Sequence, residues 1–421
     1  MNRRTLPLVV AAVLAAAVAG GAAADPAFPL KPSANNRYLV DQNDVPFLMA
    51  GDAPQSLIGN LSLAQARKFL KNRRKYGVNA LWVNLLCDSY TACNSDGTTF
   101  DGIAPFTVPG DLSTPNEAYF ARVDAMLELA ASYGMVVLLD PIETGGWLQT
   151  LRDNGIGKAR AYGRYLGSRY KDVANIIWMH GNDFQSWRDP GDNDLVIAVG
   201  KGIRDTDANH IQTAELDYLV SATLDDRKMR KLVALDAVYT YRPTYAKILQ
   251  EYQRRHFAPI FMVEANYEFE HNGGTDGGST QNLRRQEYWT LLSGATGQLY
   301  GSAYSWTFQS GWQDNLDTPG ILQFSYANQL LGARRWYDLV PDRAHRVLTQ
   351  GFGTFSEDDP IPDDTYATAA ATADGTLALA YLPSVREVTI DMTTFSGPVV
   401  AQWFDPTDNS FITIDPAPVA N

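Results

Sequence analysis

The chain has 421 residues, of which 45% are hydrophobic and 19% are charged, a composition typical of a globular protein with a large core. Its formal net charge of −12 at pH 7 disfavours binding to nucleic acid or to an anionic membrane. The length exceeds that of one ordinary domain, but an α/β barrel by itself takes up most of such a chain.

The first 24 residues have the pattern of a cleaved secretion signal. Arg3 and Arg4 form the charged start, an apolar run covers residues 6–19, and the small residues 22–24 offer a cleavage site before Asp25. A membrane anchor is the weaker alternative, because this run is short for a bilayer span. We therefore expect a secreted or periplasmic protein that is free of the membrane after cleavage.

Apolar strand-like runs alternate with amphipathic stretches along residues 25–342, which predicts repeated strand–helix units. The predicted strands are residues 47–50, 80–86, 135–139, 176–179, 211–214, 232–239, 260–263 and 299–306. The predicted helices are residues 63–76, 116–133, 156–170, 194–206, 245–256, 283–293 and 321–331, the first of them capped by Ser62. Eight nearly all-apolar strands with intervening helices predict a closed (β/α)₈ TIM barrel. An open doubly wound sheet is disfavoured, because no glycine-rich phosphate turn follows the first strand.

The pattern changes over residues 343–421. Short strand-like segments follow one another at residues 366–372, 376–382, 387–392, 399–404 and 411–414. Asp374-Gly375 has the sequence of a hairpin turn. This segment is therefore predicted to form a small antiparallel β-sandwich domain that docks on the barrel by its apolar face, and bracing of the barrel is its expected role.

Cys87 and Cys93 are the two cysteines of the chain and fall in one loop after the second predicted strand. In an oxidising compartment we expect them to form a local disulfide. A zinc site would need further Cys or His residues at ligand spacing, and the sequence offers none there. Nothing else in the sequence calls for a metal ion or an organic cofactor.

The polar residues that end each apolar run are the candidates for a functional site, because barrel enzymes work at the C-terminal ends of their strands. The candidate substrate-binding residues are Asp52, Asn84, Asp140, His180, Asn182, Glu215, Tyr239, Tyr241, Glu268 and Trp306. This set is acidic and aromatic and has few cations. Such an inventory suits the hydrolysis of glycosidic bonds, in which carboxyl groups do the chemistry and aromatic rings stack on sugars.

Two carboxylic acids end the fourth and seventh predicted strands, which lie on opposite sides of a barrel mouth. They are Asp183, in the pair Asn182-Asp183, and Glu264. Glycosidic cleavage needs one acid that protonates the leaving oxygen and one carboxylate that attacks the anomeric carbon or activates water. We predict that Asp183 is the general acid/base and Glu264 the nucleophile. Either acid alone has the alternative of bonding a loop, but the pair in these two strands favours the catalytic interpretation.

Several short motifs occur in a defined order along nearly the whole chain. They are residues 36–41 (NRYLVD), 46–52 (PFLMAGD), 77–80 (GVNA), 178–183 (WMHGND), 264–268 (EANYE), 300–301 (YG) with Trp306, 336–342 (WYDLVPD) and 402–406 (QWFDP). In this order they make the chain resemble the apiosidase-like glycoside hydrolases of family 140, formerly a domain of unknown function. The resemblance implies a barrel with a small C-terminal β-sandwich, and it implies the acid/base and nucleophile roles for Asp183 and Glu264. It also implies retention of anomeric configuration and a furanoside substrate, such as an apiosyl branch of a plant polysaccharide.

Two segments depart from the family pattern. Residues 213–217 read TAELD where the resemblance implies a His-rich turn, and residues 239–241 read YTY where Gln, Ser and His are expected. Both segments are expected to line the pocket, so the resemblance supports the catalytic pair more than the identity of the sugar.

Two other functions remain as alternatives. One is a barrel glycosidase of another specificity, such as an arabinofuranosidase, an endo-glucanase or a mannanase. The other is a non-catalytic surface protein that binds polysaccharide or matrix protein, which the presence of both acids disfavours. The sequence does not distinguish exo from endo action and does not indicate an oligomeric state.

Overall fold

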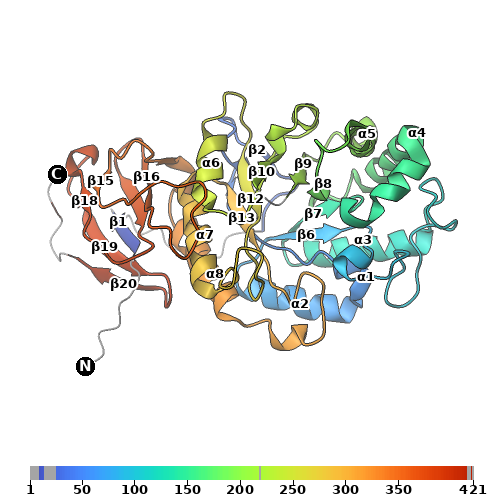
Figure 1. Ribbon diagram of the computed structural model, residues 1–421, viewed down its shortest axis with the longest axis horizontal. Helices are drawn as coiled ribbons and strands as arrows, with labels where there is room; N and C mark the ends of the chain where they lie inside the picture. The colour runs from blue at the N-terminus through green and yellow to red at the C-terminus, as the bar shows by residue number, and fades with distance from the viewer. Residues whose placement is uncertain (1–8, 14–24, 218–219, 415–418, 420–421) are drawn as a thin grey trace.

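The computed structural model describes residues 9–13, 25–217, 220–414 and 419. A barrel of parallel strands, surrounded by helices, forms the larger part of the molecule (Figure 1). A smaller domain of antiparallel sheets, red in Figure 1, packs against one side of the barrel. The predicted (β/α)₈ barrel with a C-terminal β-sandwich is confirmed.

The barrel strands follow one another around the sheet in chain order. They are β5 (Met49–Asp52), β6 (Ala80–Asn84), β7 (Val136–Asp140), β8 (Ile176–Phe184), β9 (Gln212–Leu216), β11 (Asp236–Thr240), β12 (Ile260–Glu264) and β13 (Gly297–Tyr300). Neighbouring strands pair in parallel from β11 through β13 to β5 and on to β9. Nearly all their side chains are buried, which explains the apolar runs in the sequence.

The barrel closes between β9 and β11, where the Ala234 N–H donates to the Gln212 carbonyl at 2.9 Å and a threonine side chain adds two further bonds. Strand β10 (Val220–Ala222) pairs antiparallel with β11 next to this seam. The buried Thr223 hydroxyl accepts a hydrogen bond from the Ala237 N–H at 3.0 Å and donates one to the Ala214 carbonyl. One threonine therefore connects the backbones of the two strands.

Eight α-helices occur in the described residues, and the predicted helices are confirmed with shifts at their ends. They are α1 (Leu57–Asn60), α2 (Leu63–Lys75), α3 (Glu117–Ala131), α4 (Thr144–Tyr170), α5 (Pro190–Thr206), α6 (Thr244–Tyr252), α7 (Thr280–Leu292) and α8 (Pro319–Gly332). Ser62 caps α2 as predicted, accepting from the Gln65 N–H at 3.3 Å. Helix α4 begins at Thr144 rather than at residue 156, because Gly155, with φ of 69°, joins two helical segments across a kink. Within the described ranges, no helix is long and apolar enough to cross a membrane.

A small antiparallel sheet precedes the first barrel strand. It consists of β2 (Lys31–Pro32), β3 (Leu39–Val40) and β4 (Pro46–Phe47). Phe47, predicted to begin the first barrel strand, belongs to this sheet instead, and Leu48 separates it from β5. The Phe47 ring packs with Leu30 and Met49 in one buried apolar cluster that includes residues of the barrel strands.

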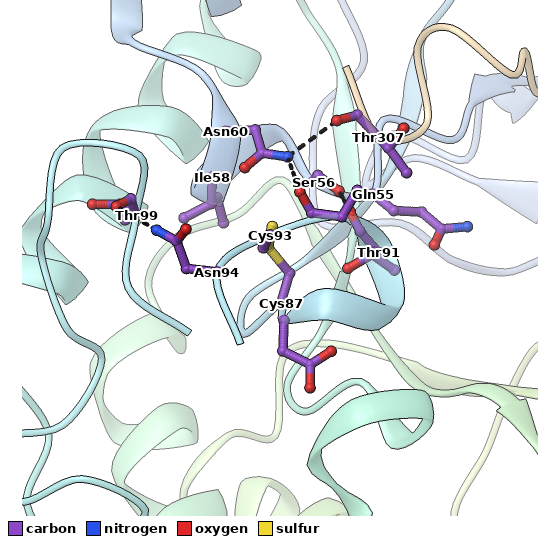
Figure 2. The surroundings of a disulfide bond; sticks show 12 residues. Gln55, Ser56, Ile58, Asn60, Cys87, Thr91, Cys93, Asn94, Thr99 and Thr307 are labelled. Atoms are coloured by element: carbon purple, nitrogen blue, oxygen red, sulfur yellow. Dashed lines mark hydrogen bonds between the residues drawn. A yellow bond between two sulfur atoms is a disulfide. The ribbon is translucent and has the colours of Figure 1, made fainter. Parts of the chain in front are cut away.

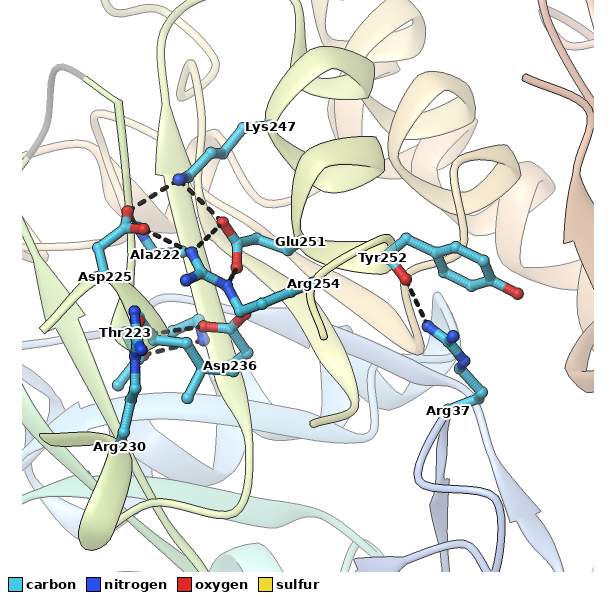
Figure 3. A network of polar contacts seen from close by, with 12 residues as sticks. Arg37, Ala222, Thr223, Asp225, Arg230, Asp236, Lys247, Glu251, Tyr252 and Arg254 are labelled. Atoms are coloured by element: carbon cyan, nitrogen blue, oxygen red, sulfur yellow. Dashed lines mark hydrogen bonds and ion pairs between the residues drawn. The ribbon is translucent and has the colours of Figure 1, made fainter. Parts of the chain in front are cut away.

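A polar network stabilises the outer side of the β10–β11 region (Figure 3). The Lys247 ammonium of α6 lies 2.8 Å from an Asp225 oxygen and 2.9 Å from a Glu251 oxygen, and Arg254 pairs with both acids. Asp236, at the start of β11, is buried beside Glu251. Burial, and then the Glu251 charge, raise the pKa of Asp236 well above its usual value, which favours a neutral Asp236. The network thus binds α6 to the loop after β10, at the barrel end opposite to the strand C-termini.

The C-terminal domain contains a six-stranded antiparallel sheet and a two-stranded sheet. The larger sheet has the order β14 (Leu339–Pro341), β16 (Thr368–Thr372), β17 (Leu377–Tyr381), β1 (Val9–Val13), β19 (Val400–Asp405) and β20 (Ser410–Thr413). The smaller sheet pairs β15 (Leu348–Gln350) with β18 (Thr389–Ile390). Leu348, Ala369, Ala380 and Ile390 pack together between the two sheets, as expected for a sandwich.

The predicted signal, residues 1–24, lies outside the described residues except for the backbone of β1. This strand runs antiparallel to both β17 and β19 and separates them. Cleavage after residue 24 would remove β1, so its place in the sheet and removal of the signal exclude each other. Export therefore stays a prediction.

The six-stranded sheet docks on barrel helix α7. Trp289 and Leu292 of this helix share one buried apolar cluster with Leu379 and Tyr381 of β17. The Trp289 indole N–H also donates to the Tyr366 carbonyl at 2.9 Å. The domain thus meets the barrel through an apolar face, which suits a bracing role.

Candidate active site

A pocket of about 250 Å³ opens at the C-terminal ends of the barrel strands. Its lining is rich in phenol, carboxyl and amide groups: Gln55, Tyr90, Asn182, Asp183, Tyr239, Tyr241, Glu264, Tyr267, Glu270, Asn272 and Trp306. The structure therefore brings six predicted site residues together in one cavity, namely Asn182, Asp183, Tyr239, Tyr241, Glu264 and Trp306.

Three tyrosine hydroxyls hold the Glu264 carboxylate. Its Oε1 accepts from Tyr239 at 2.6 Å and from Tyr241 at 2.7 Å, and its Oε2 accepts from Tyr267 at 2.8 Å. Burial, and then the charge of Asp183, raise the pKa of Glu264, whereas the three hydroxyls act in the opposite direction. Hydrogen bonds from O–H donors stabilise the ionised form, so the tyrosines favour a charged Glu264 with a defined orientation.

The backbone around Asp183 is irregular. Gly181, Asn182 and Asp183 all have positive φ values, of 121°, 85° and 53°, and the pairing of β8 with β9 shifts register between Gly181 and Phe184. A side chain at Gly181 would overlap the Glu215 carbonyl, so only glycine fits there. Non-glycine residues adopt positive φ at a cost, and such strain is concentrated at functional sites. The bulge turns Asn182 and Asp183 into the pocket.

The Asp183 carboxyl is held by groups from two other elements. Its Oδ2 accepts a hydrogen bond from the Tyr90 hydroxyl. Burial raises the pKa of Asp183, and the hydroxyls of Tyr90 and Tyr239 oppose this rise. The charge of Asp183 raises the pKa of Glu264, so ionisation of one acid disfavours ionisation of the other.

Glu215 lies buried under Asp183 rather than in the pocket lining. Its Oε2 accepts from the Asp183 N–H at 2.5 Å. Burial, and then the charges of Asp183 and Glu264, raise the pKa of Glu215 well above its usual value, which favours the neutral acid. Glu215 therefore supports the strained backbone of Asp183.

A chain of amides and a phenol connects the fourth and seventh strands. Asn182 donates to the Gln55 side-chain oxygen at 2.9 Å, and Gln55 donates to the Tyr267 hydroxyl at 3.5 Å. Tyr267 in turn donates to Glu264. These bonds fix the position of Asn182 relative to Glu264 on the opposite strand. Asn182 also lines the cavity.

His180 does not reach the pocket. Its Nε2 lies 2.8 Å from the Gln212 side-chain oxygen, and Gln212 donates to the Gly200 carbonyl of α5 at 3.2 Å. Burial lowers the pKa of His180 to about 4, so the imidazole is neutral. This residue contributes to packing of the strand against α5.

Four more predicted residues bond to the barrel rather than line the pocket. Asp52 forms a buried ion pair with Arg73, and Asn84 accepts from the Trp82 indole at 3.2 Å. Asp140 accepts from the Ile142 N–H at 3.2 Å.

Glu268 is the fourth of these residues. It accepts from Tyr300 and Thr318, both at 2.5 Å, and from the Gly320 N–H at 2.9 Å. This carboxylate thus caps the N-terminus of α8, where the helix dipole favours a negative charge.

Five residues of the lining were not among the predicted site residues: Gln55, Tyr90, Tyr267, Glu270 and Asn272. They lie in the loops after the strands, whereas the prediction was restricted to residues at or close to strand ends. Tyr267 belongs to the motif of residues 264–268, and this motif was the signal that could have identified it as a site residue. Tyr90 has no such signal, because it lies in the long connection between β6 and α3.

The predicted disulfide between Cys87 and Cys93 is confirmed (Figure 2). It closes a short turn over the carboxyl end of β6, with a Cα–Cα distance of 5.8 Å. Within the described residues, no group of three or more His, Cys, Asp or Glu side chains is arranged to hold a metal ion.

The catalytic-domain model of the apiosidase-like family matches residues 33–338 of this sequence. A search of curated proteins returns no match. The chain shares its fold with solved glycoside hydrolases. A family 5 glycoside hydrolase from Bacteroides vulgatus is 22% identical at a TM-score of 0.79, with 91% of this chain and 87% of that one covered. A protein described as a glycoside hydrolase is 20% identical at a TM-score of 0.80, with 93% and 92% covered.

A family 5 mannosidase from Rhizomucor miehei is more distant, at 12% identity and a TM-score of 0.52, with 74% of this chain and 99% of that one covered. At these identities the structural likeness establishes the fold, and the family match covers the barrel with its pocket. The chain belongs to the apiosidase-like family and is a glycoside hydrolase.

Proposed function

We propose that this protein is an exported, retaining glycoside hydrolase that removes a furanoside of the apiosyl type from a branched plant-type polysaccharide. The observation that carries the proposal is the pair of carboxyl groups in one pocket, with Glu264 held by three phenol hydroxyls and Asp183 turned inward by a strained bulge.

In this proposal Glu264 attacks the anomeric carbon while Asp183 gives its proton to the leaving oxygen. The bond from the anomeric carbon to the leaving oxygen breaks, and a glycosyl ester of Glu264 forms. Asp183, now ionised, removes a proton from water, and the resulting hydroxide releases the sugar from Glu264. Two successive inversions retain the anomeric configuration.

The roles of the two acids follow from their partners. Three O–H donors stabilise negative charge on Glu264, which suits the nucleophile. Burial raises the pKa of both acids, but two hydroxyls oppose the rise for Asp183 against three for Glu264, which suits Asp183 as the acid.

The pocket volume suits one or two sugar residues, and its walls offer hydrogen-bonding groups together with the indole of Trp306. A terminal branch sugar fits such a short cavity better than a long main chain does. The furanoside assignment itself comes from the family. A glycosidase of other specificity, such as an arabinofuranosidase, an endo-glucanase or a mannanase, is the second candidate, because Tyr239 and Tyr241 depart from the family pattern.

The test is hydrolysis of a panel of nitrophenyl furanosides and pyranosides, and of plant cell-wall fractions, by the wild type and by Glu264→Gln. Release of one furanose that is lost in the variant supports the proposal, and proton NMR of the first product formed reports retention. Glu268→Gln is the matched control, because Glu268 caps α8 outside the pocket. Release of a pyranose alone would favour the second candidate. Binding of polysaccharide without hydrolysis would favour a non-catalytic carbohydrate-binding protein.

A further inference from the structure

Tyr90 reaches the pocket from the turn that the disulfide closes. It lies in the short 3₁₀ helix η1 (Ser89–Thr91), and its hydroxyl donates to Asp183 Oδ2. We propose that the disulfide-closed turn of residues 87–93 holds Tyr90 in position, and that Tyr90 in turn positions the acid/base Asp183. The inference rests on the proposed function, since it assigns to Asp183 the role given there.

Several bonds hold the turn in one conformation besides the disulfide. The Asp88 side chain accepts from the Tyr90 N–H at 2.7 Å, and the Asp88 carbonyl accepts from the Cys93 N–H at 2.7 Å. Ala92 adopts the left-handed conformation, with φ of 59°, so that the chain can return to Cys93. The turn is therefore a closed unit around Tyr90.

The turn is also bound to the loop after the first barrel strand (Figure 2). The Ser56 hydroxyl donates to the Thr91 carbonyl, and the Asn60 amide donates to the Ala92 carbonyl at 3.1 Å. Both acceptors directly follow Tyr90 in the sequence. Movement of the Tyr90 backbone would break these bonds.

Two glycines directly after the first residue of helix α4 leave room for the turn of residues 87–93. A side chain at Gly145 would overlap the Tyr90 ring, and one at Gly146 would overlap the Asp88 carboxylate. Glycine is a poor helix former, so two of them in the first turn of a helix need a packing reason. Close contact with the disulfide-closed turn provides that reason.

The chemistry follows from this placement. Burial, and then the Asp183 charge, raise the pKa of Tyr90 far above its usual value, so Tyr90 remains a donor through the pH range of the enzyme. Because the phenol donates to Oδ2, the acidic proton of Asp183 is carried by Oδ1, which sets the direction of proton transfer to the leaving oxygen. The same bond stabilises the ionised carboxylate and so keeps the pKa of Asp183 from rising further.

The first test is Tyr90→Phe, with the pH dependence of kcat/KM as readout. A hydrogen bond to a charged group contributes about 1.5–3 kcal/mol, which corresponds to a pKa change of about 1–2. We expect the alkaline limb, which reports loss of the Asp183 proton, to move up by about 1–2 pH units. We also expect kcat to fall by about 10-fold or more on natural glycosides and much less on nitrophenyl glycosides, whose leaving groups need little protonation. The melting temperature checks that the variant is folded.

The second test removes the disulfide by the paired substitution Cys87→Ser and Cys93→Ser, alone and together with Tyr90→Phe. We expect the paired substitution to reproduce the shift of the alkaline limb and to add little to it when Tyr90→Phe is already present. Full additivity of the two effects, or an unchanged limb in Tyr90→Phe, would overturn the inference.

The two proposals fail in different ways. If the wild type hydrolyses a glycoside and Glu264→Gln does not, but Tyr90→Phe behaves as the wild type, only the positioning role is wrong. If the wild type hydrolyses none of the glycosides or cell-wall fractions, the proposed function is wrong and the role of Tyr90 is lost with it.

Discussion

Replacement of Tyr267 by phenylalanine is expected to shift the acidic limb of the pH–activity profile. In the wild type the Tyr267 hydroxyl donates to Glu264 Oε2 at 2.8 Å, while Tyr239 and Tyr241 bond to the other oxygen. The substitution keeps the buried ring and removes this one donor to an ionised carboxylate, a bond that contributes about 1.5–3 kcal/mol. At 1.36 kcal/mol for each pKa unit, the pKa of Glu264 rises by about 1–2.

The sign follows from the state of Glu264 that reacts. In the proposed mechanism only ionised Glu264 attacks, so a higher pKa moves the acidic limb of kcat/KM to higher pH by the same amount, about 1–2 units. Below the limb, kcat/KM falls by about 10- to 100-fold at a given pH, and the loss becomes smaller as the pH rises.

The assay is kcat/KM for an aryl glycoside between about pH 4 and 10, because burial raises the pKa of Glu264 to about 8 and the substitution is expected to raise it by about 1–2 more. Tyr300→Phe is the matched control, because the buried Tyr300 hydroxyl donates to Glu268, outside the pocket. An acidic limb at the wild-type position in Tyr267→Phe, or an equal shift in Tyr300→Phe, would refute the assignment of Glu264 as the ionised group.

Four further outcomes are expected. Glu215→Gln is expected to retain activity, because the amide oxygen still accepts from the Asp183 N–H. Glu215→Ala removes that acceptor and should lower kcat. Steady-state kinetics compare the two variants. Burial raises the pKa of Glu143 to about 9. Between the ordinary carboxyl pKa and about 9, the folded state therefore binds more protons than the unfolded state, and the free energy of unfolding falls as the pH rises through this range. The melting temperature of Glu143→Gln should depend less on pH over the same window; equal slopes would contradict the assignment. Arg285 donates to the carbonyls of Pro362 and Asp364 at 2.8 and 3.0 Å, so Arg285→Ala should lower the free energy of unfolding by at least about 2 kcal/mol in urea titrations. Intact-mass analysis of the exported protein should show Asp25 as the first residue; a mass that includes residues 1–24 would mean that β1 stays in the sheet.

The sequence determined the architecture well, because the strands of a barrel are buried on both sides and so appear as apolar runs. The main error at the first strand concerned Phe47, which belongs to a separate small sheet. Helix α4 was predicted to begin at residue 156 but begins at Thr144, because the chain continues as helix on both sides of the kink at Gly155. Strand β1 could not be predicted, since residues 9–13 have the pattern of a signal and their pairing partners lie more than three hundred residues away.

For the site, local sequence was sufficient to place Asp183 and Glu264 at strand ends, and barrel geometry then brought them to one mouth. The same local pattern selected Asp52 and Glu268, which bond to Arg73 and to the start of α8 instead. In the sequence, a carboxylate at a strand end has the same pattern whether it lines the pocket or bonds to the barrel. Its role depends on which side chains face it in the folded structure.

Sequence by itself thus predicted the closed barrel, the disulfide pair and the position of the two acids at strand ends, since each depends on residue type and neighbouring positions. Only the tertiary structure decided which side chains hold those acids. Tyr90 meets Asp183 across 93 positions of sequence, and Tyr239 meets Glu264 across 25. Such contacts arise where separate loops converge over the barrel, and hydrogen bonding there depends on distances and directions that residue spacing does not contain.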